Sequence, residues 1–344
     1  MSCVKILIRF ALGVCGLLLV PRAAHLMAQH GAVPSSAKIV RLDPRFDKLV
    51  PPSAVLEKIA GGFQWTEGPV WNRKDGYLLF SDIPNNAVMQ WKPGGKAGVF
   101  LKNSGYTGSK PYEGPEPGSN GLIYDSAGRL VLCEHGDRRI ARLEADGRQT
   151  AIAGRYQGKR FNSPNDLVYK SNGDLYFTDP PYGLPKTFDD PQRELDYCGV
   201  FRVTPRGAVT LLAREIKAPN GIAFSPDEKI LYISSSDPQH AIWMAYDVQD
   251  DGTLARGRVF FDATAWTRDG KGLPDGMKID RAGNLFATGP GGLHVFAPDG
   301  THLGAFAFDT AVSNCAWGND GSVLYLTVST TVYRIQLTTK GEGF

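Results

Sequence analysis

The chain has 344 residues, with 38 lysines and arginines against 35 aspartates and glutamates. This near balance gives no electrostatic reason to expect a nucleic acid or an anionic membrane as partner. Helical periodicity is scarce, and 40 glycines and 23 prolines divide the chain into short segments typical of strands and turns. The composition therefore favours an all-β protein.

The first 28 residues have the features of a secretory signal peptide. Lys5 and Arg9 precede an apolar run over residues 10–20, and small residues follow as far as Ala28. The run is too short to span a bilayer comfortably, so we expect cleavage near Ala28, or at Ala24, rather than a retained anchor. Cleavage removes three basic residues and leaves 35 against 35 acidic ones. We predict a neutral periplasmic or secreted protein, a monomer or dimer with no attachment to the membrane.

The mature chain, residues 29–344, is expected to form one domain of six similar units. Each unit has an apolar strand, a turn and further strands. The units span residues 62–101, 119–153, 164–213, 219–262, 274–308 and 313–337. A period of about 40–55 residues with about four strands per unit predicts a six-bladed β-propeller.

The connections between the units carry two further expectations. The last unit has too few strands, and residues 54–59, just ahead of the first unit, are expected to complete it and close the ring. An insert rich in Gly and Pro over residues 102–118 separates units one and two. We expect this long loop to lie over one face, where loops of this length tend to carry function.

Three cysteines remain after cleavage: Cys133, Cys198 and Cys315. Cys133 and Cys315 lie in strand-like apolar runs, so buried thiols are favoured over a disulfide. No Cys-x-x-Cys or His-x-x-x-His spacing occurs, so a structural zinc site is not indicated.

A short polar phrase recurs at the head of the units. It is Pro-Asn-Asp at 164–166, Pro-Asn-Gly at 219–221 and Pro-Asp-Gly at 274–276, a step of 55 residues each time, with looser copies at 67–69, 119–121 and 313–315. Asn-Gly and Asp-Gly often form hairpin turns, but here the turn lies about five residues downstream. The Asn or Asp therefore begins the innermost strand of its blade, at one mouth of the central channel.

Four oxygen-bearing side chains would converge at that mouth from four blades: Glu67, Asn165, Asn220 and Asp275. Two carboxylates and two amide carbonyls, with no thiol or imidazole, form a ligand set for a hard cation. We predict one divalent metal ion in the central channel, with Ca²⁺ as first choice and Zn²⁺, Mg²⁺ or Mn²⁺ as alternatives.

Several stretches resemble one enzyme family, that of gluconolactonase, senescence marker protein and luciferin-regenerating enzyme. They are Glu-Gly-Pro-Val-Trp at 67–71, Asn-Ser-Pro-Asn-Asp-Leu at 162–167, Phe-Thr-Asp-Pro-Pro-Tyr-Gly at 177–183, Pro-Asn-Gly-Ile-Ala-Phe-Ser-Pro-Asp at 219–227 and Pro-Asp-Gly-Met-Lys-Ile-Asp at 274–280. The resemblance covers residues 55–337. The Ser-Asn-Gly at 119–121 and the phrase Cys-Glu-His-Gly-Asp-Arg-Arg at 133–139 are most similar to the bacterial gluconolactonase branch. It implies a six-bladed propeller that hydrolyses lactones with a divalent metal, whose ligands map onto Glu67, Asn165, Asn220 and Asp275.

A metal-polarised lactone carbonyl also needs a base that activates water. Asp275 is the first candidate, because a metal-bound carboxylate keeps one oxygen free to accept a proton. Asp179, at the channel-mouth end of the second strand of its unit, is the second candidate, with a loop-start residue as the alternative. His135 is assigned the corresponding place in unit two, either as a base or as a structural histidine.

The candidate substrate-binding residues are Asn120, Asn165, Tyr182 and Asn314. Asn120 and Asn314 are expected to donate hydrogen bonds to the substrate, with turn capping as the alternative. Tyr182 and Tyr106 are candidate walls of the pocket.

We therefore expect hydrolysis of a small-molecule lactone, such as glucono-1,5-lactone, to its aldonic acid. One alternative is a promiscuous aryl-lactonase or phosphotriesterase on the same site, and another is a propeller that binds partners without chemistry. The two buried acids weigh against the second alternative. The absence of a Gly-x-Ser-x-Gly sequence argues against a serine esterase.

Overall fold

The computed structural model describes residues 37–344, and the predicted signal peptide at residues 1–28 lies outside these residues. Residues 37–344 lie within one compact unit. Among residues 37–344, no helix is both long and apolar enough to cross a membrane.

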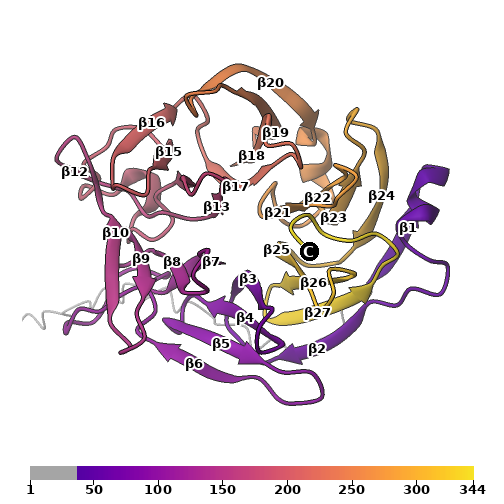
Figure 1. Cartoon of the computed structure of the whole chain (residues 1–344), viewed down its shortest axis with the longest axis horizontal. Coiled ribbons are helices and arrows are strands. Elements are labelled where there is room, and N and C mark those ends of the chain that lie inside the picture. Colours follow the sequence, from indigo (N-terminus) through magenta and orange to yellow (C-terminus); the bar gives the residue numbers. More distant parts are fainter. Residues whose placement is uncertain (1–36) are drawn as a thin grey trace, which may run out of the picture. The chain divides into compact units, whose positions relative to one another are not determined.

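Six antiparallel sheets are arranged as blades around a central axis (Figure 1), which confirms the predicted six-bladed propeller. Blade one contains β3 (Thr66–Asn72), β4 (Tyr77–Asp82), β5 (Ala87–Trp91) and β6 (Gly98–Lys102). Blade two contains β7 (Ser119–Tyr124), β8 (Leu130–Glu134), β9 (Arg139–Leu143) and β10 (Gln149–Ala153). Blade three contains β13 (Leu167–Tyr169), β14 (Leu175–Asp179), β15 (Gly199–Val203) and β16 (Val209–Ala213).

The second half of the ring repeats this order, with the first strand of each blade nearest the axis. Blade four contains β17 (Pro219–Phe224), β18 (Ile230–Asp237), β19 (His240–Val248) and β20 (Leu254–Asp262). Blade five contains β21 (Met277–Ile279), β22 (Leu285–Gly289), β23 (Gly292–Phe296) and β24 (His302–Ala307). Blade six contains β25 (Val312–Gly318), β26 (Val323–Val328), β27 (Thr331–Gln336) and β2 (Glu57–Gly61). A small hairpin is formed by β11 (Arg155–Tyr156) and β12 (Lys159–Arg160), and the short 3₁₀ helices are η1 (Pro44–Lys48), η2 (Thr187–Asp189) and η3 (Thr264–Arg268).

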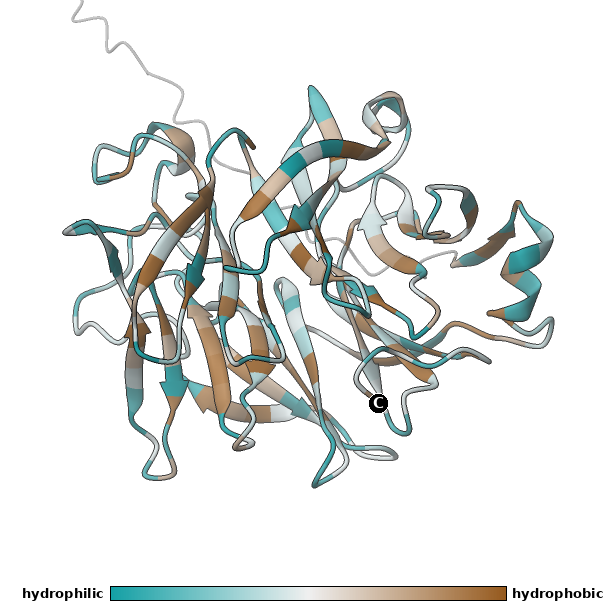
Figure 2. Ribbon diagram, turned by 45° about the horizontal axis from the view of Figure 1, so that its top comes forward, coloured by the Kyte–Doolittle hydropathy of each residue, from teal (hydrophilic) through white to brown (hydrophobic). Residues whose placement is uncertain are grey.

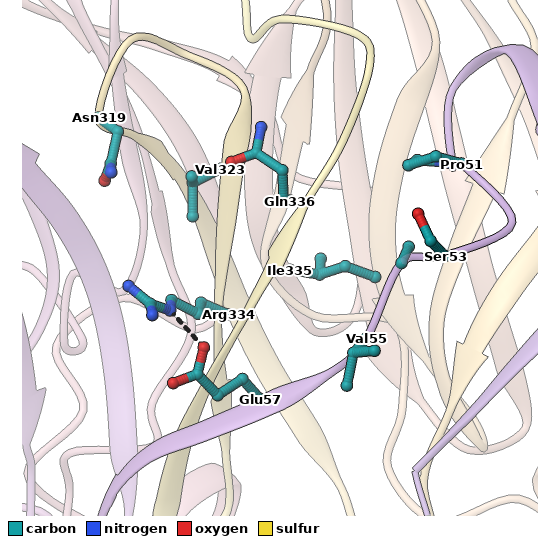
Figure 3. A pocket seen from close by; sticks show the side chains of 10 residues that line it. Pro51, Ser53, Val55, Glu57, Asn319, Val323, Arg334, Ile335 and Gln336 are labelled. Carbon is teal, nitrogen blue, oxygen red and sulfur yellow. Dashed lines mark hydrogen bonds and ion pairs between the residues drawn. The ribbon is translucent and has the colours of Figure 1, made fainter.

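The ring is closed by β2, which pairs antiparallel with β27 as the outermost strand of blade six. This confirms closure by the segment ahead of blade one, although the strand spans 57–61 rather than 54–59. It begins where Glu57 faces Arg334, 2.8 Å from its guanidinium, while Ala54 is still held in a turn by the Pro51 carbonyl. Figure 3 shows this ion pair in a surface pocket, which contains none of the predicted site residues.

A fifth strand on blade five was not predicted. β1 (Lys38–Arg41) pairs antiparallel with β24, and the η1 helix that follows places Phe46 in the core, 6.0 Å from the Phe306 ring. Four residues carry too little periodicity to indicate a strand by themselves.

The blades pack through the apolar faces of their strands. Successive side chains along a strand point to opposite faces of the sheet, so they contact the two neighbouring blades in turn. Figure 2 shows hydrophobic segments concentrated in the strands and hydrophilic segments in the connecting loops. In blade three, for example, the Phe177 and Phe201 rings stack 5.5 Å apart and Phe161 packs edge-on against Phe177. Val131 and Cys133 of blade two belong to the same core cluster as Phe177 and Phe201, so this packing joins neighbouring blades.

Blade five carries a buried histidine, His294, beside the half-buried His302. The Nδ1 atom of His294 lies 3.3 Å from Nε2 of His302, and the Trp266 ring covers both. Burial, with a smaller effect from the neighbouring His302, lowers the pKa of His294 from 6.5 to about 4. Its Nε2 lies 3.0 Å from the Pro290 carbonyl, so the neutral ring donates there.

We expect this histidine to make the fold sensitive to acid. Between pH 6.5 and pH 4 the unfolded chain binds a proton that folded His294 does not, so the free energy of unfolding falls as the pH falls. His294→Gln keeps a donor for the Pro290 carbonyl without titrating. From pH 7 to pH 5, urea unfolding should show the wild type losing about 2 kcal/mol more than the variant. Equal losses in both proteins would contradict this assignment.

Candidate active site at the centre of the ring

Six side chains occupy equivalent positions at the heads of the innermost strands. They are Glu67, Asn120, Asn165, Asn220, Asp275 and Asn314, one from each blade. The equivalence is visible in the backbone, because Asn165 donates to the Thr178 carbonyl as Asp275 donates to that of Thr288. Five of the six residues are buried; Asp275 is half-buried, and its Oδ1 atom is buried.

Glycine follows four of these heads because the neighbouring blade packs against that position. A Cβ atom at Gly68 would lie 2.0 Å from the Asn120 carbonyl oxygen, and one at Gly276 would lie 2.0 Å from the Asn314 amide carbon. The repeated Asn-Gly and Asp-Gly phrases therefore reflect close packing between blades around the axis, and not a hairpin turn.

Three amide side chains from consecutive blades form a hydrogen-bonded chain. Asn120 Nδ2 donates to Asn165 Oδ1 at 2.7 Å, and Asn165 Nδ2 donates to Asn220 Oδ1. Asn220 Nδ2 in turn donates to Ser236 Oγ at 3.0 Å. A carbonyl oxygen has two lone pairs, so Asn165 and Asn220 each keep one for a further partner.

A second set of contacts crosses the axis. Asn314 Nδ2 lies 3.1 Å from Glu67 Oε2 in the adjacent blade and 3.4 Å from Asp166 Oδ2 in blade three. Blades three and six stand opposite each other in the ring (Figure 1), so the Asp166 side chain reaches across its centre. Glu67, Asn314 and Asp166 therefore meet at the axis.

The centre carries closely spaced acidic groups. Burial raises the pKa of Glu67, Asp166 and Asp275, and the charge of Asp166 raises the first and last further. The charge of Glu116, from the loop over residues 103–118, also raises the pKa of Glu67 and Asp275. Three carboxyl groups in one buried space resist being ionised together unless a cation balances them.

The donor set fits a hard cation held partly by amides. Asp275 Oδ1 and Asn120 Oδ1 are buried without a hydrogen-bond partner, which leaves two oxygen atoms free for a ligand. Within residues 37–344, no three His, Cys, Asp or Glu side chains are arranged to hold a metal by themselves. A cation at this centre would therefore need the amide oxygens of Asn165 and Asn220.

Asp179 serves as a structural acceptor at the end of β14. Its Oδ2 accepts from the Asn162 backbone at 2.8 Å, as Asp82 at the end of β4 accepts from the backbone of Gln64 and Trp65. Asp179 is fully buried, which raises its pKa to about 7, and its Oδ1 has no partner. Both aspartates thus hold the loop that leads into an innermost strand.

The residue equivalent to Asp179 in blade two is Glu134, so the predicted correspondence of His135 is wrong by one position. Strand pairing of Leu122 with Leu132, and of Leu167 with Phe177, fixes this register. β8 extends to Glu134 because its buried carboxylate pairs with Arg139 across the hairpin.

His135 itself is fully buried beside the loop over residues 103–118. Glu116 Oε2 lies 3.1 Å from its Nδ1, but neither ring nitrogen is aligned for a hydrogen bond. The loop docks on blades one to three, since the Gly118 carbonyl accepts from the His135 backbone and the Tyr112 hydroxyl donates to the Gly183 carbonyl. These bonds hold the loop beside blades two and three.

The other candidate substrate-binding groups are also placed by the structure. The NH₂ groups of Asn120 and Asn314 donate within the protein, so the atom that Asn120 leaves free is an acceptor. The buried Tyr182 hydroxyl makes no hydrogen bond; burial raises its pKa, and the charge of Asp275 raises it further. Cys133 and Cys315 are buried free thiols, as predicted, and Cys198 is also a buried free thiol.

Comparison with known proteins shows the family of the chain. Residues 65–330 match the family model described as the SMP-30/Gluconolactonase/LRE-like region. The chain belongs to this family.

The matches to individual relatives cover most of the chain. A gluconolactonase from Zymomonas mobilis subsp. mobilis is 40% identical over 315 residues, which cover 88% of this chain and 87% of the relative. A pentonolactonase, XacC, from Haloferax volcanii is 27% identical and covers 76% of this chain and 81% of its own. The structure of a gluconolactonase from Xanthomonas campestris has a TM-score of 0.76 at 32% identity, covering 89% of this chain and 98% of that one. Regucalcin from Agrobacterium tumefaciens, described as a calcium-binding protein, has a TM-score of 0.64 at 19% identity and covers 82% and 92%, which supports the fold alone.

Three polar residues of this family member were missed by sequence reasoning. Asp166 stands where four other blades have glycine, and that departure from the repeat was a usable signal. Glu116 lies in an irregular loop and Ser236 follows the central part of β18, so neither belongs to a recurrent phrase. Their proximity to the axis depends on the tertiary structure.

Proposed function

We propose that the protein is a lactonase that hydrolyses a sugar lactone, such as glucono-1,5-lactone, to its aldonic acid with one divalent cation. The observation that carries this proposal is the convergence of buried carboxylates and amides from all six blades in a chain of the gluconolactonase family. Relatives named gluconolactonase and pentonolactonase support the class of substrate. The predicted signal peptide supports action in the periplasm or outside the cell.

Glu67, Asn165, Asn220 and Asp275 would hold the cation, with Ca²⁺ as first choice. When bound, the cation would supply the positive charge that polarises the lactone carbonyl and stabilises the negative oxygen formed on attack. The acid-rich centre supports this role. The free Asn120 oxygen would accept a hydrogen bond from a substrate hydroxyl.

Asp275 is proposed as the base. Its Oδ1 would take a proton from water as the water oxygen bonds to the carbonyl carbon. The ring C–O bond of the tetrahedral intermediate would then break, and the proton would return from Asp275 to the leaving oxygen. Asp179 is the weaker candidate, because one of its carboxylate oxygens already holds the backbone of Asn162.

Removal of the cation should destabilise the ring. A ligand held by four blades stabilises the folded state by about 3 kcal/mol at a concentration near 100 times Kd. We therefore expect chelation to lower Tm by about 5 °C and abolish activity, with both restored by calcium. Elemental analysis that finds below about a tenth of a metal ion per fully active chain after dialysis against calcium would refute the metal role.

Substitutions should separate the base from the ligands. Asp275→Asn keeps a coordinating oxygen but loses the proton acceptor, so kcat should fall by about 10²–10⁴ with the fold retained. Glu67→Gln should chiefly weaken cation binding, and activity should recover at high calcium. Asp179→Asn and His135→Ala serve as comparisons in the same assay. If Asp275→Asn remains near the wild-type rate while either comparison is inactive, the base is that residue instead.

A substrate panel tests the preference for a hydroxylated ring. With donors and acceptors lining the centre, kcat/KM for glucono-1,5-lactone should exceed that for a long-chain acyl-homoserine lactone and for paraoxon. A tenfold preference for either apolar substrate, about 1.4 kcal/mol in transition-state binding, would replace the sugar-lactone assignment by the aryl-lactonase or phosphotriesterase alternative. No turnover of any substrate with calcium present would favour a binding scaffold.

A further inference from the structure

Ser236 ends the chain of amides that links blades two to four. It lies near the end of β18 and is half-buried, with its Oγ atom between two partners from different blades. The Pro274 carbonyl oxygen is 2.6 Å away, and Asn220 Nδ2 is 3.0 Å away. Pro274 immediately precedes Asp275, so this one hydroxyl contacts both a proposed cation ligand and the segment that carries the proposed base.

The first contact determines the direction of the second. A backbone carbonyl can only accept a hydrogen bond, so the single hydrogen of Ser236 must be donated to Pro274. Ser236 then has only lone pairs for Asn220. The Asn220 amide must therefore present its NH₂ group to Ser236 and turn its oxygen the other way.

This direction passes along the whole chain. The Asn220 oxygen accepts from the NH₂ group of Asn165, and the Asn165 oxygen accepts from that of Asn120. A reversed Asn220 would set its NH₂ group against that of Asn165, and two donors cannot satisfy each other. The chain thus runs in one sense only, and it ends at the buried, unpaired Asn120 Oδ1.

We propose that Ser236 is a positioning residue that fixes the polarity of the Asn120–Asn165–Asn220 chain. The site consequently presents amide oxygens to a divalent cation and a free acceptor, Asn120 Oδ1, to a hydroxyl group of the substrate. This inference rests on the proposed function and names a residue outside its ligands and base. The equivalent position in blade three is Pro180, which has no hydroxyl. The direction of the hydrogen bonds along the three amides is therefore determined by Ser236 in blade four.

The test measures cation binding directly. Calcium titrations of the metal-free mature protein, followed by calorimetry, should give a Kd about 10-fold or more higher for Ser236→Ala than for the wild type. Ser236→Thr keeps the hydroxyl and should restore a Kd close to that of the wild type. Ser234→Ala is the matched control, because Ser234 lies on the same strand and accepts from the Gly221 backbone at 2.7 Å, with no hydrogen bond to the three amide side chains. It should lower Tm but leave the calcium Kd unchanged.

A second readout follows the acceptor end of the chain. δ-Valerolactone has no ring hydroxyls, so it cannot use the free Asn120 oxygen. At saturating calcium, the ratio of kcat/KM for glucono-1,5-lactone to kcat/KM for δ-valerolactone should therefore be about 10-fold lower in Ser236→Ala than in the wild type. An unchanged calcium Kd and an unchanged ratio in Ser236→Ala would overturn this inference alone. A wild-type protein that hydrolyses lactones without binding any divalent cation would overturn the metal part of the proposed function, and this inference with it.

Discussion

Buried hydroxyl groups that bond one blade to the backbone of the next fix the centre of the ring. These hydrogen bonds run from Ser81 to the Asn120 carbonyl, from Thr178 to that of Asn220, from Thr288 to that of Ser313 and from Ser313 to that of Thr66. Where blade two has Cys133 instead of a hydroxyl, the Gly121 backbone donates directly to the Asn165 carbonyl at 2.7 Å. Each bond ends at or beside the head of an innermost strand, so the same contacts that join the blades also place the polar side chains.

Such fixed placement explains how the protein maintains an arrangement that is unfavourable by itself. Glu67, Asp166 and Asp275 share a buried space, where desolvation and mutual repulsion oppose their ionised forms. A flexible site would relax by turning these side chains outward. Here the apolar packing between blades and the hydrogen bonds of the buried hydroxyl groups hold these side chains in place. The buried carboxylates then lack a compensating positive charge, which a bound cation would supply.

The architecture could be predicted because it repeats. A period of 55 residues and polar heads on apolar strands are local patterns, and they indicated the blades, the closing strand and the six central side chains. Features that depend on a single contact could not be found in this way. β1 is recognisable only beside β24, Glu116 only where its loop docks, and the register of Glu134 only from the pairing of Leu122 with Leu132. The place of Asp179 in the repeat could not show whether its carboxylate holds a loop by accepting hydrogen bonds or acts as a base, since both roles require a carboxylate at a strand end.

The six heads divide the ring into two chemically different sides. Blades two to four contribute three neutral amides in a row, whereas Asp275 and Glu67 flank the single amide of blade six. Asp166 reaches across from the amide side and adds its charge to the acidic side. On the proposed function, charge would be balanced and the carbonyl attacked at the acidic side, while the amide side would recognise hydroxyl groups. Because a lactone ring carries its carbonyl and its hydroxyls on different atoms, this division would orient the substrate without any movement of the rigid ring.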